Sequence, residues 1–172
     1  MKFLTLNECT AWCRHHRYEL SEREGHNSPY PELSDSEFQC VEYELPEDSG
    51  SKVALAKLTF ESFDKPDEVL LWLRAWEVWP SSGHLPLFMR LRQSFGADRS
   101  IFETPGHLVP WTEQDDALSI LVISLEFFWD CVVLTSSGRD AFFVSHDEYF
   151  KFLSREAVVA GQFKTKVDQG NL

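Results

Sequence analysis

The apolar stretch Ala117–Trp129 constrains the fold of this chain more than any other sequence feature. It is interrupted by serine and glutamate and is too short to cross a bilayer, so it is a core element. Thr112 and Asp115 form a helix-capping pattern, which predicts a helix over residues 112–128. Such a helix is apolar on nearly every side and should lie at the centre of the fold. A buried strand over Leu118–Leu125 is the competing interpretation, but the cap and the length favour a helix. The side chains predicted to be most deeply buried are Leu118, Leu121, Val122 and Leu125.

Turn-bounded apolar segments predict two β-hairpins. Glu37–Leu45 alternates between apolar and acidic residues, and Val53–Phe60 resumes the pattern after a turn rich in proline, serine and glycine. Cys131–Thr135 and Asp140–Val144 flank a second turn of serine and glycine. We therefore predict an α+β fold in which both hairpins form one antiparallel sheet, with helices packed over one face.

Capping patterns and helical spacing predict four more helices in addition to the central one. They are Leu6–His16, a helix that begins at Pro66 and stops before Pro80, Leu85–Phe95 and His146–Leu153. Residues 21–36 form an irregular connection whose conformation the sequence leaves open. Residues 1–155 are predicted to be a single domain, and residues 156–172, which lack a firm period, a partly mobile tail.

The net charge of −12 excludes two classes of partner. Binding nucleic acid depends on lysine and arginine that neutralise phosphates, and an anionic membrane surface would also repel this protein. The acidic residues are concentrated between Glu19 and Asp48, where Arg23 alone opposes them. A basic protein partner would be steered to such a face. A solvated surface that maintains solubility is the other interpretation.

The cysteines are predicted to be reduced and free of metal. The four cysteines have no framework spacing, and the N-terminus becomes polar too soon for a signal peptide, which indicates a cytoplasmic protein. Cys9, Cys13 and His16 lie on one helix face and could hold a soft metal, but no fourth ligand is near. Buried, inert thiols explain the same spacing. We therefore predict no metal and no cofactor.

Three polar motifs could carry chemistry. Glu103 and His107 flank a Pro-Gly turn, which could bring a carboxylate and an imidazole together as acid and base or as a buried structural pair. The consecutive residues 145–148, Ser-His-Asp-Glu, look like a catalytic set, but neighbours project in different directions and a helix cap is the simpler interpretation. Arg90 and Arg92 point about 200° apart around a helix, whereas Arg90 and Gln93 share a face.

The C-terminal half resembles a family of uncharacterised bacterial proteins. The residues that carry this resemblance are Trp79-Pro80-Ser81-Ser82, Arg90-Leu91-Arg92-Gln93-Ser94-Phe95-Gly96, Glu103-x-Pro105-Gly106-His107-Leu108, Phe128-Trp129-Asp130 and Ser145-His146-Asp147-Glu148. The family has no assigned activity, so the resemblance implies only a set of shared motif residues. That candidate functional cluster is Arg90, Arg92, Gln93, Glu103, His107, Asp130 and His146.

The leading functional prediction is a non-catalytic, cytoplasmic protein-interaction module whose acidic face contacts a basic partner, as an immunity or antitoxin-like inhibitor would. One alternative is a small hydrolase-type enzyme that uses Glu103, His107, Asp130 and His146. Another is a small-molecule binder beneath the segment that contains Trp72, Trp76 and Trp79.

Overall fold

One seven-stranded antiparallel sheet organises the protein. The computed structural model describes residues 1–21, 29–31, 33, 37–76 and 81–170. The strand order is β1-β6-β5-β7-β8-β9-β4. The strands are β1 (Lys2–Leu4), β4 (Gln39–Glu44), β5 (Glu68–Ala75), β6 (Gly106–Pro110), β7 (Asp130–Thr135), β8 (Asp140–Val144) and β9 (Tyr149–Ser154), and a separate pair is formed by β2 (Leu20–Ser21) and β3 (Tyr30–Pro31).

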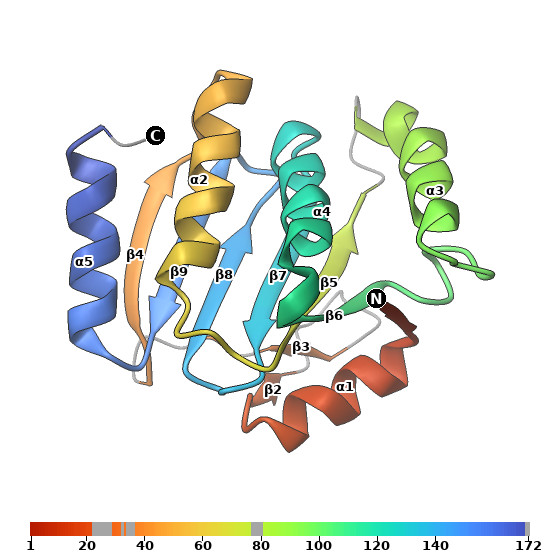
Figure 1. The fold of residues 1–172 in the computed structure, drawn as a ribbon, viewed down its shortest axis with the longest axis horizontal. Coiled ribbons are helices and arrows are strands. Elements are labelled where there is room, and N and C mark those ends of the chain that lie inside the picture. Colours follow the sequence, from red (N-terminus) through yellow and green to blue (C-terminus); the bar gives the residue numbers. More distant parts are fainter. Residues whose placement is uncertain (22–28, 32, 34–36, 77–80, 171–172) are drawn as a thin grey trace.

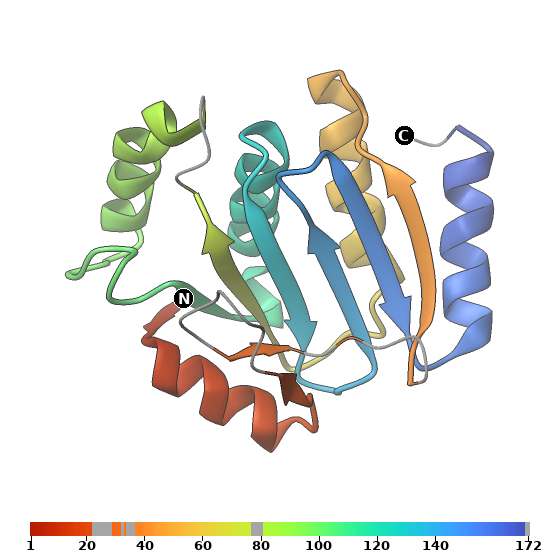
Figure 2. The same cartoon turned by 180° about the vertical axis from the view of Figure 1, so that it is seen from behind.

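Helices cover one face of this sheet and part of the other. The helices are α1 (Leu6–His15), α2 (Ser49–Ser62), α3 (Leu85–Ser94), α4 (Gln114–Glu126) and α5 (Ala157–Asp168), with short 3-10 turns η1 (Ser81–His84) and η2 (Trp111–Glu113). Figure 1 shows α5, α2 and α4 side by side across the near face, with α3 beyond α4. Seen from behind, α1 and the β2–β3 pair lie at the opposite face, near the end of the sheet where β5 begins (Figure 2).

Strand alternation divides the core into two layers. Along β5, Val69 and Leu71 face the large cluster beneath the helices, whereas Leu70 and Trp72 join the cluster against α1. All four side chains are fully buried. This interior strand is therefore apolar on both faces, and each face of the sheet carries its own hydrophobic cluster.

Several sequence predictions are confirmed. The fold is α+β with an antiparallel sheet, and the hairpin of β7 and β8 has the predicted bounds to within one residue. Thr5 and Glu8 form the predicted capping box of α1. Gly96 ends α3 in the left-handed conformation that favours glycine, with φ of 89°.

The predicted strand Val53–Phe60 is wrong, and with it the first hairpin. These residues belong to α2, whose N-cap Asp48 accepts a hydrogen bond from the Ser51 amide at 2.9 Å. The same segment also has buried residues at helical spacing, since Lys52, Leu55, Ala56 and Thr59 form one inward face. The strand Glu37–Leu45 is real, as β4, but it pairs with β9.

The predicted helix from Pro66 to before Pro80 is also wrong, because Glu68–Ala75 forms the interior strand β5. Burial of five consecutive residues, Val69–Leu73, removes the alternation that would have indicated a strand. Trp72 therefore lies in β5 and Trp76 directly follows it, so neither is on a helix, and Trp79 lies outside the described residues.

The predicted helix His146–Leu153 is a β-hairpin instead. The Ser145 hydroxyl accepts from the Asp147 amide at 3.1 Å, and the Glu148 amide donates to the Ser145 carbonyl at 3.2 Å. Four residues, 145–148, therefore join β8 to β9, and Glu148 takes the left-handed position (φ 63°) that usually holds glycine in such a loop. The predicted capping box does not form.

The C-terminal segment from residue 156 is helical rather than a loose tail. Residues 157–168 form α5, which packs Ala160 and Phe163 against the sheet. Phe163 stacks on Phe152 of β9 with ring centroids 4.1 Å apart. Residues 171–172 lie outside the described part.

The central helix is confirmed as α4, although its N-terminus differs from the prediction. The helix begins after η2, and its N-cap is Glu113, without a side-chain capping bond, rather than Thr112. Leu121 and Leu125 are fully buried, whereas Leu118 and Val122 are half-buried because α4 keeps an outer surface between α2 and α3. Within the described residues no helix is long and apolar enough to span a membrane.

Candidate functional site

The seven predicted cluster residues lie in several separate places. Arg90 and Gln93 share the outer surface of α3, as predicted, and the Arg90 guanidinium donates to the Gln93 amide oxygen at 3.2 Å. Arg92 points the opposite way and is fully buried. Its Nη2 donates to the Thr104 carbonyl at 2.7 Å and to the Thr104 hydroxyl at 2.8 Å. Arg90 and Arg92 therefore cannot act on one ligand.

Glu103 and His107 do not meet, so the predicted acid–base pair is wrong. The Glu103 carboxylate is exposed and accepts from the hydroxyl and amide of Ser100, and these bonds hold its pKa below the ordinary value. His107 lies in β6 opposite Leu71 and is fully buried. The chain reverses before Thr104, so the carboxylate remains outside while the imidazole enters the core.

His107 and Arg92 share an apolar compartment beneath α3. The imidazole packs against Phe3 and Phe88, with ring centroids 5.5 and 5.7 Å away. The Arg92 guanidinium lies 5.0 Å from the centre of the Phe3 ring. Burial, together with the Arg92 charge, lowers the pKa of His107 to about 3, which keeps the imidazole neutral.

Most polar atoms of this compartment lack partners. Among the described residues, neither ring nitrogen of His107 has a hydrogen-bond partner, and neither do Nε and Nη1 of Arg92. The backbone carbonyls of Leu71 and Pro105 act to raise the pKa of His107, but their positions relative to its ring nitrogens do not meet the geometry of a hydrogen bond. Buried polar groups are normally paired, so this compartment departs from the usual pattern of a core.

Asp130 and His146 are a second pair of predicted residues that the fold joins by hydrogen bonds, and here the two residues come from different strands and loops. Asp130 Oδ1 accepts from the backbone amide of His146 at 2.7 Å and lies 2.8 Å from its Nδ1. Partial burial lowers the pKa of His146, but the Asp130 hydrogen bond and the charges of Asp130 and Asp147 outweigh it, so the pKa is raised. The pair fixes the β8–β9 loop to the start of β7 and leaves the imidazole half-exposed.

The same loop contributes to an accumulation of negative charge, which we call the acidic end. Its members are the exposed carboxylates Glu44, Glu47, Asp48, Asp147 and Glu148. The register of β4 against β9 places Glu44 opposite Tyr149, and the Leu45 amide donates to the Glu148 carbonyl at 2.8 Å. It lies where β4 leads into α2 and β8 turns into β9, at the upper edge of the sheet in Figure 1.

The acidic end includes part of the predicted acidic face. Glu22, Glu24, Glu32 and Asp35 lie outside the described residues. Glu37 and Glu42 are neutralised by Arg155 and Lys151 at 2.9 and 2.7 Å. No lysine or arginine of the described chain forms an ion pair with the acidic end, and its one cationic contact is His146 Nε2, 3.6 Å from Asp147.

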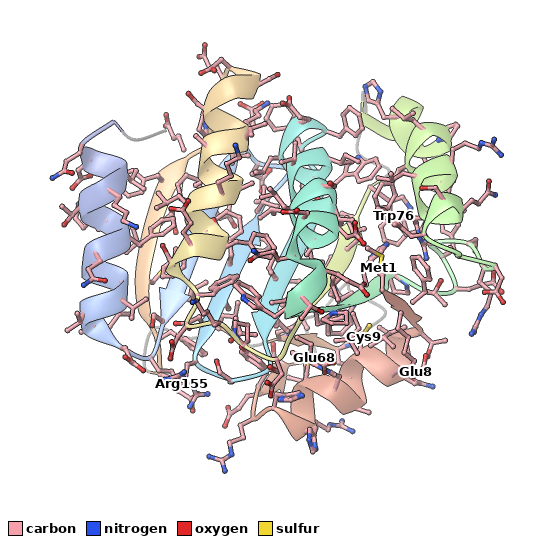
Figure 3. All side chains as sticks on the ribbon, in the orientation of Figure 1. Met1, Glu8, Cys9, Glu68, Trp76 and Arg155 are labelled. Atoms are coloured by element: carbon pink, nitrogen blue, oxygen red, sulfur yellow. The ribbon has the colours of Figure 1, made fainter. Side chains whose placement is uncertain are left out.

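The possible metal ligands on α1 do not converge. Cys9, labelled in Figure 3, lies between α1 and the sheet. Cys13 is buried in the same cluster, and burial raises its pKa to about 12. His16 turns away, and its Nδ1 lies 2.6 Å from the Ser136 carbonyl. No group of three metal-ligating side chains exists in the described part of the chain. None of the four cysteines forms a disulfide in the described structure.

Sequence reasoning missed a groove of about 530 Å³ between α1 and the strands β5 and β6. Trp12 lines it and donates from its indole to Glu68 at 2.7 Å, and His16 Nε2 lies 4.0 Å from the same carboxylate. Glu68 begins the strand that was predicted to be a helix, so no local pattern indicated that it lies beside α1.

Comparison with protein-family models, curated proteins and solved structures finds no match for this chain. The resemblance of the C-terminal half to a bacterial family therefore stays a prediction, and functional inference depends on the geometry above.

Proposed function

We propose that this protein is a non-catalytic protein-binding module that captures a basic partner through the acidic end. The observation that carries this proposal is the set of exposed carboxylates on β4, the start of α2 and the β8–β9 loop, without a lysine or arginine paired to them in the described chain. Exposed like charges repel one another, so their concentration on one edge does not stabilise the isolated fold. A complementary basic surface would relieve that repulsion on binding.

The conformation of Glu148 supports the same proposal. A non-glycine residue at φ of 63° carries strain of about 1 kcal/mol, and asparagine or glycine would relax it while removing the charge. The hairpin nevertheless holds a glutamate at this position, beside Asp147 and near Glu44. Strained residues that persist against a simple alternative tend to occur at functional sites.

The test replaces Glu44, Glu47 and Glu148 by glutamine in one variant, which removes three negative charges from the acidic end. Stopped-flow fluorescence then measures the association of this variant with a synthetic lysine-rich peptide. Asp48 stays unchanged because it caps α2. We expect the association rate constant at low salt to fall by at least about tenfold, with a smaller salt dependence.

A matched control removes the same charge elsewhere on the surface. Glu19, Glu61 and Asp115 are exposed and lie outside the acidic end. The control variant carries Glu19→Gln, Glu61→Gln and Asp115→Asn, so its net charge equals that of the acidic-end variant. It should retain most of the association rate. Equal losses in the two variants would show that only the total charge matters, and the assignment of the acidic end would be wrong.

A small hydrolase-type enzyme is the second candidate function, and the Asp130–His146 pair favours it. The carboxylate orients Nδ1, so Nε2 is the nitrogen that could exchange a proton with a substrate. Glu103 and His107 do not contribute, since one is exposed elsewhere and the other is buried. Hydrolysis of activated esters that depends on His146, and disappears in His146→Gln without loss of folding, would support this function over simple binding.

A further inference from the structure

Arg92 is a buried cation without an anion. It is fully buried, and none of the described residues offers it a carboxylate within ion-pair distance. Thr104 accepts from Nη2 alone, and the Phe3 face supplies a weaker cation–π contact. A buried charge without a counterion is strongly unfavourable, so the fold needs a further partner for this guanidinium.

We propose that the compartment formed by Arg92, His107, Phe3 and Phe88 is a binding site for a small monovalent anion, such as a halide ion or a short carboxylate. This inference goes beyond the proposed function and involves neither the acidic end nor the β8–β9 loop. The anion would accept hydrogen bonds from the unpaired Nε or Nη1 of Arg92 and from the N–H of the His107 imidazole.

The elements around the site fix these donors in place. Phe88 and Arg92 are four residues apart on α3, so they project from the same inward face. Antiparallel pairing of β6 with β1 and β5 places Phe3 opposite His107 on one side and Leu71 on the other. The donors therefore face an apolar surround, where an anion–guanidinium contact is stronger than in water.

The charge of the site selects a monoanion. His107 remains neutral because burial lowers its pKa to about 3, so Arg92 supplies the single positive charge. One negative charge neutralises it, whereas a sulfate or phosphate dianion would leave a net buried charge. A water molecule could occupy the donors but would leave the guanidinium uncompensated.

The first test measures the thermal unfolding midpoint against sodium bromide and sodium formate, with sodium sulfate at equal ionic strength as the reference. Wild type should show a saturable rise of about 5–10 °C at one hundred times the dissociation constant. Arg92→Met should lose the rise, while Arg90→Met, on the exposed side of the same helix, should keep it. An equal response in wild type and Arg92→Met, or no response in wild type, overturns the proposal.

A second variant and a direct measurement keep the proposal testable if Arg92→Met fails to fold. His107→Phe retains the cation and removes one donor, so its dissociation constant for bromide should increase by at least about fivefold. Bromide-soaked crystals of the wild type should show an anomalous peak within hydrogen-bond distance of Arg92 and His107. An unchanged dissociation constant in His107→Phe, or density for water alone at the site, contradicts the assignment.

Discussion

Replacing His107 with phenylalanine should make the protein less sensitive to acid. In the native state this imidazole is buried, neutral and without a hydrogen-bond partner among the described residues. Arg92 is the charged group that acts on it, and this cation disfavours a second positive charge. In the unfolded chain the same imidazole takes up a proton freely. Lowering the pH therefore favours the unfolded state through this one residue.

The size of the effect follows from the two pKa values. The native pKa is about 3, and the ordinary value is 6.5. The stability linked to this group is fully present above the ordinary value and is lost as the pH falls toward the native value. Between about pH 7 and about pH 4.5 the wild type should lose about 2.5 kcal/mol through His107 alone. The phenylalanine variant should lose none of this portion.

At neutral pH the substitution itself should cause little change. The neighbours of the ring are Phe3 and Phe88, and the swap nearly conserves volume, so the free energy of unfolding should change by less than about 1.5 kcal/mol. Removing two unpaired buried nitrogens acts in the stabilising direction. The free energy of unfolding of the variant should therefore be close to that of the wild type at neutral pH and higher than that of the wild type at acid pH.

The free energy of unfolding of both proteins is measured across this pH range by urea unfolding, which is followed by tryptophan fluorescence. A sulfate buffer keeps the proposed anion site unoccupied. Other groups with lowered pKa values, such as Glu8 and Asp48, are common to both and cancel in the difference. If the two stability curves remain parallel from neutral to acid pH, His107 is not a buried neutral imidazole. His146→Phe is the control of opposite sign, because its raised native pKa gives stability that is present at acid pH and lost as the pH rises through that value.

Three further predictions concern the core. Leu121→Ala should destabilise the fold by about 2–5 kcal/mol in urea unfolding, and clearly more than the half-buried Leu118→Ala; a loss well under about 1 kcal/mol would mean that α4 is peripheral. Gly106→Ala should be strongly destabilising because its Cβ would lie 2.3 Å from the Cys9 sulfur, and adding Cys9→Ala should recover part of the loss in a double-mutant cycle. Cys9 should react with iodoacetamide far more slowly than half-buried Cys40 in native protein, and protein purified without added metal should contain no stoichiometric zinc.

The sequence predicted best those elements whose ends have local chemical signals. Thr5 and Glu8 cap α1 through contacts three residues apart, and the β7–β8 hairpin has a short turn between two clear apolar runs. The failure at β5 has another cause, which is that burial by distant segments changed the pattern. Val69–Leu73 lost its alternation because α1 covers the second face of β5, and that contact joins residues far apart in the chain.

The candidate site shows the same limit. Residues four apart or on one turn can be related from sequence, and the opposed directions of Arg90 and Arg92 followed from helical geometry alone. The convergence of Arg92 on His107 depends on how α3 packs over β6, and that of Asp130 on His146 depends on the strand register. Neither can be obtained from spacing. The sequence of residues 103–107 indicates the turn between Glu103 and His107, and this turn suggested a pair. The direction in which each side chain points cannot be read from the sequence.

The left-handed Glu148 in the acidic end and the uncompensated Arg92 beneath α3 are both unfavourable for the isolated chain. A protein selected for stability alone would readily replace both, with asparagine or glycine in the loop and an apolar side chain in the core. Glu148→Asn should therefore raise the free energy of unfolding while slowing capture of the basic peptide. Arg92→Met should also raise the free energy of unfolding, measured in sulfate, and should abolish the rise of the unfolding midpoint with bromide. A variant that is more stable than the wild type but binds its ligand less well would identify the replaced residue as functional. If both variants are less stable than the wild type, the two residues serve the fold, and neither proposed site is needed to explain them.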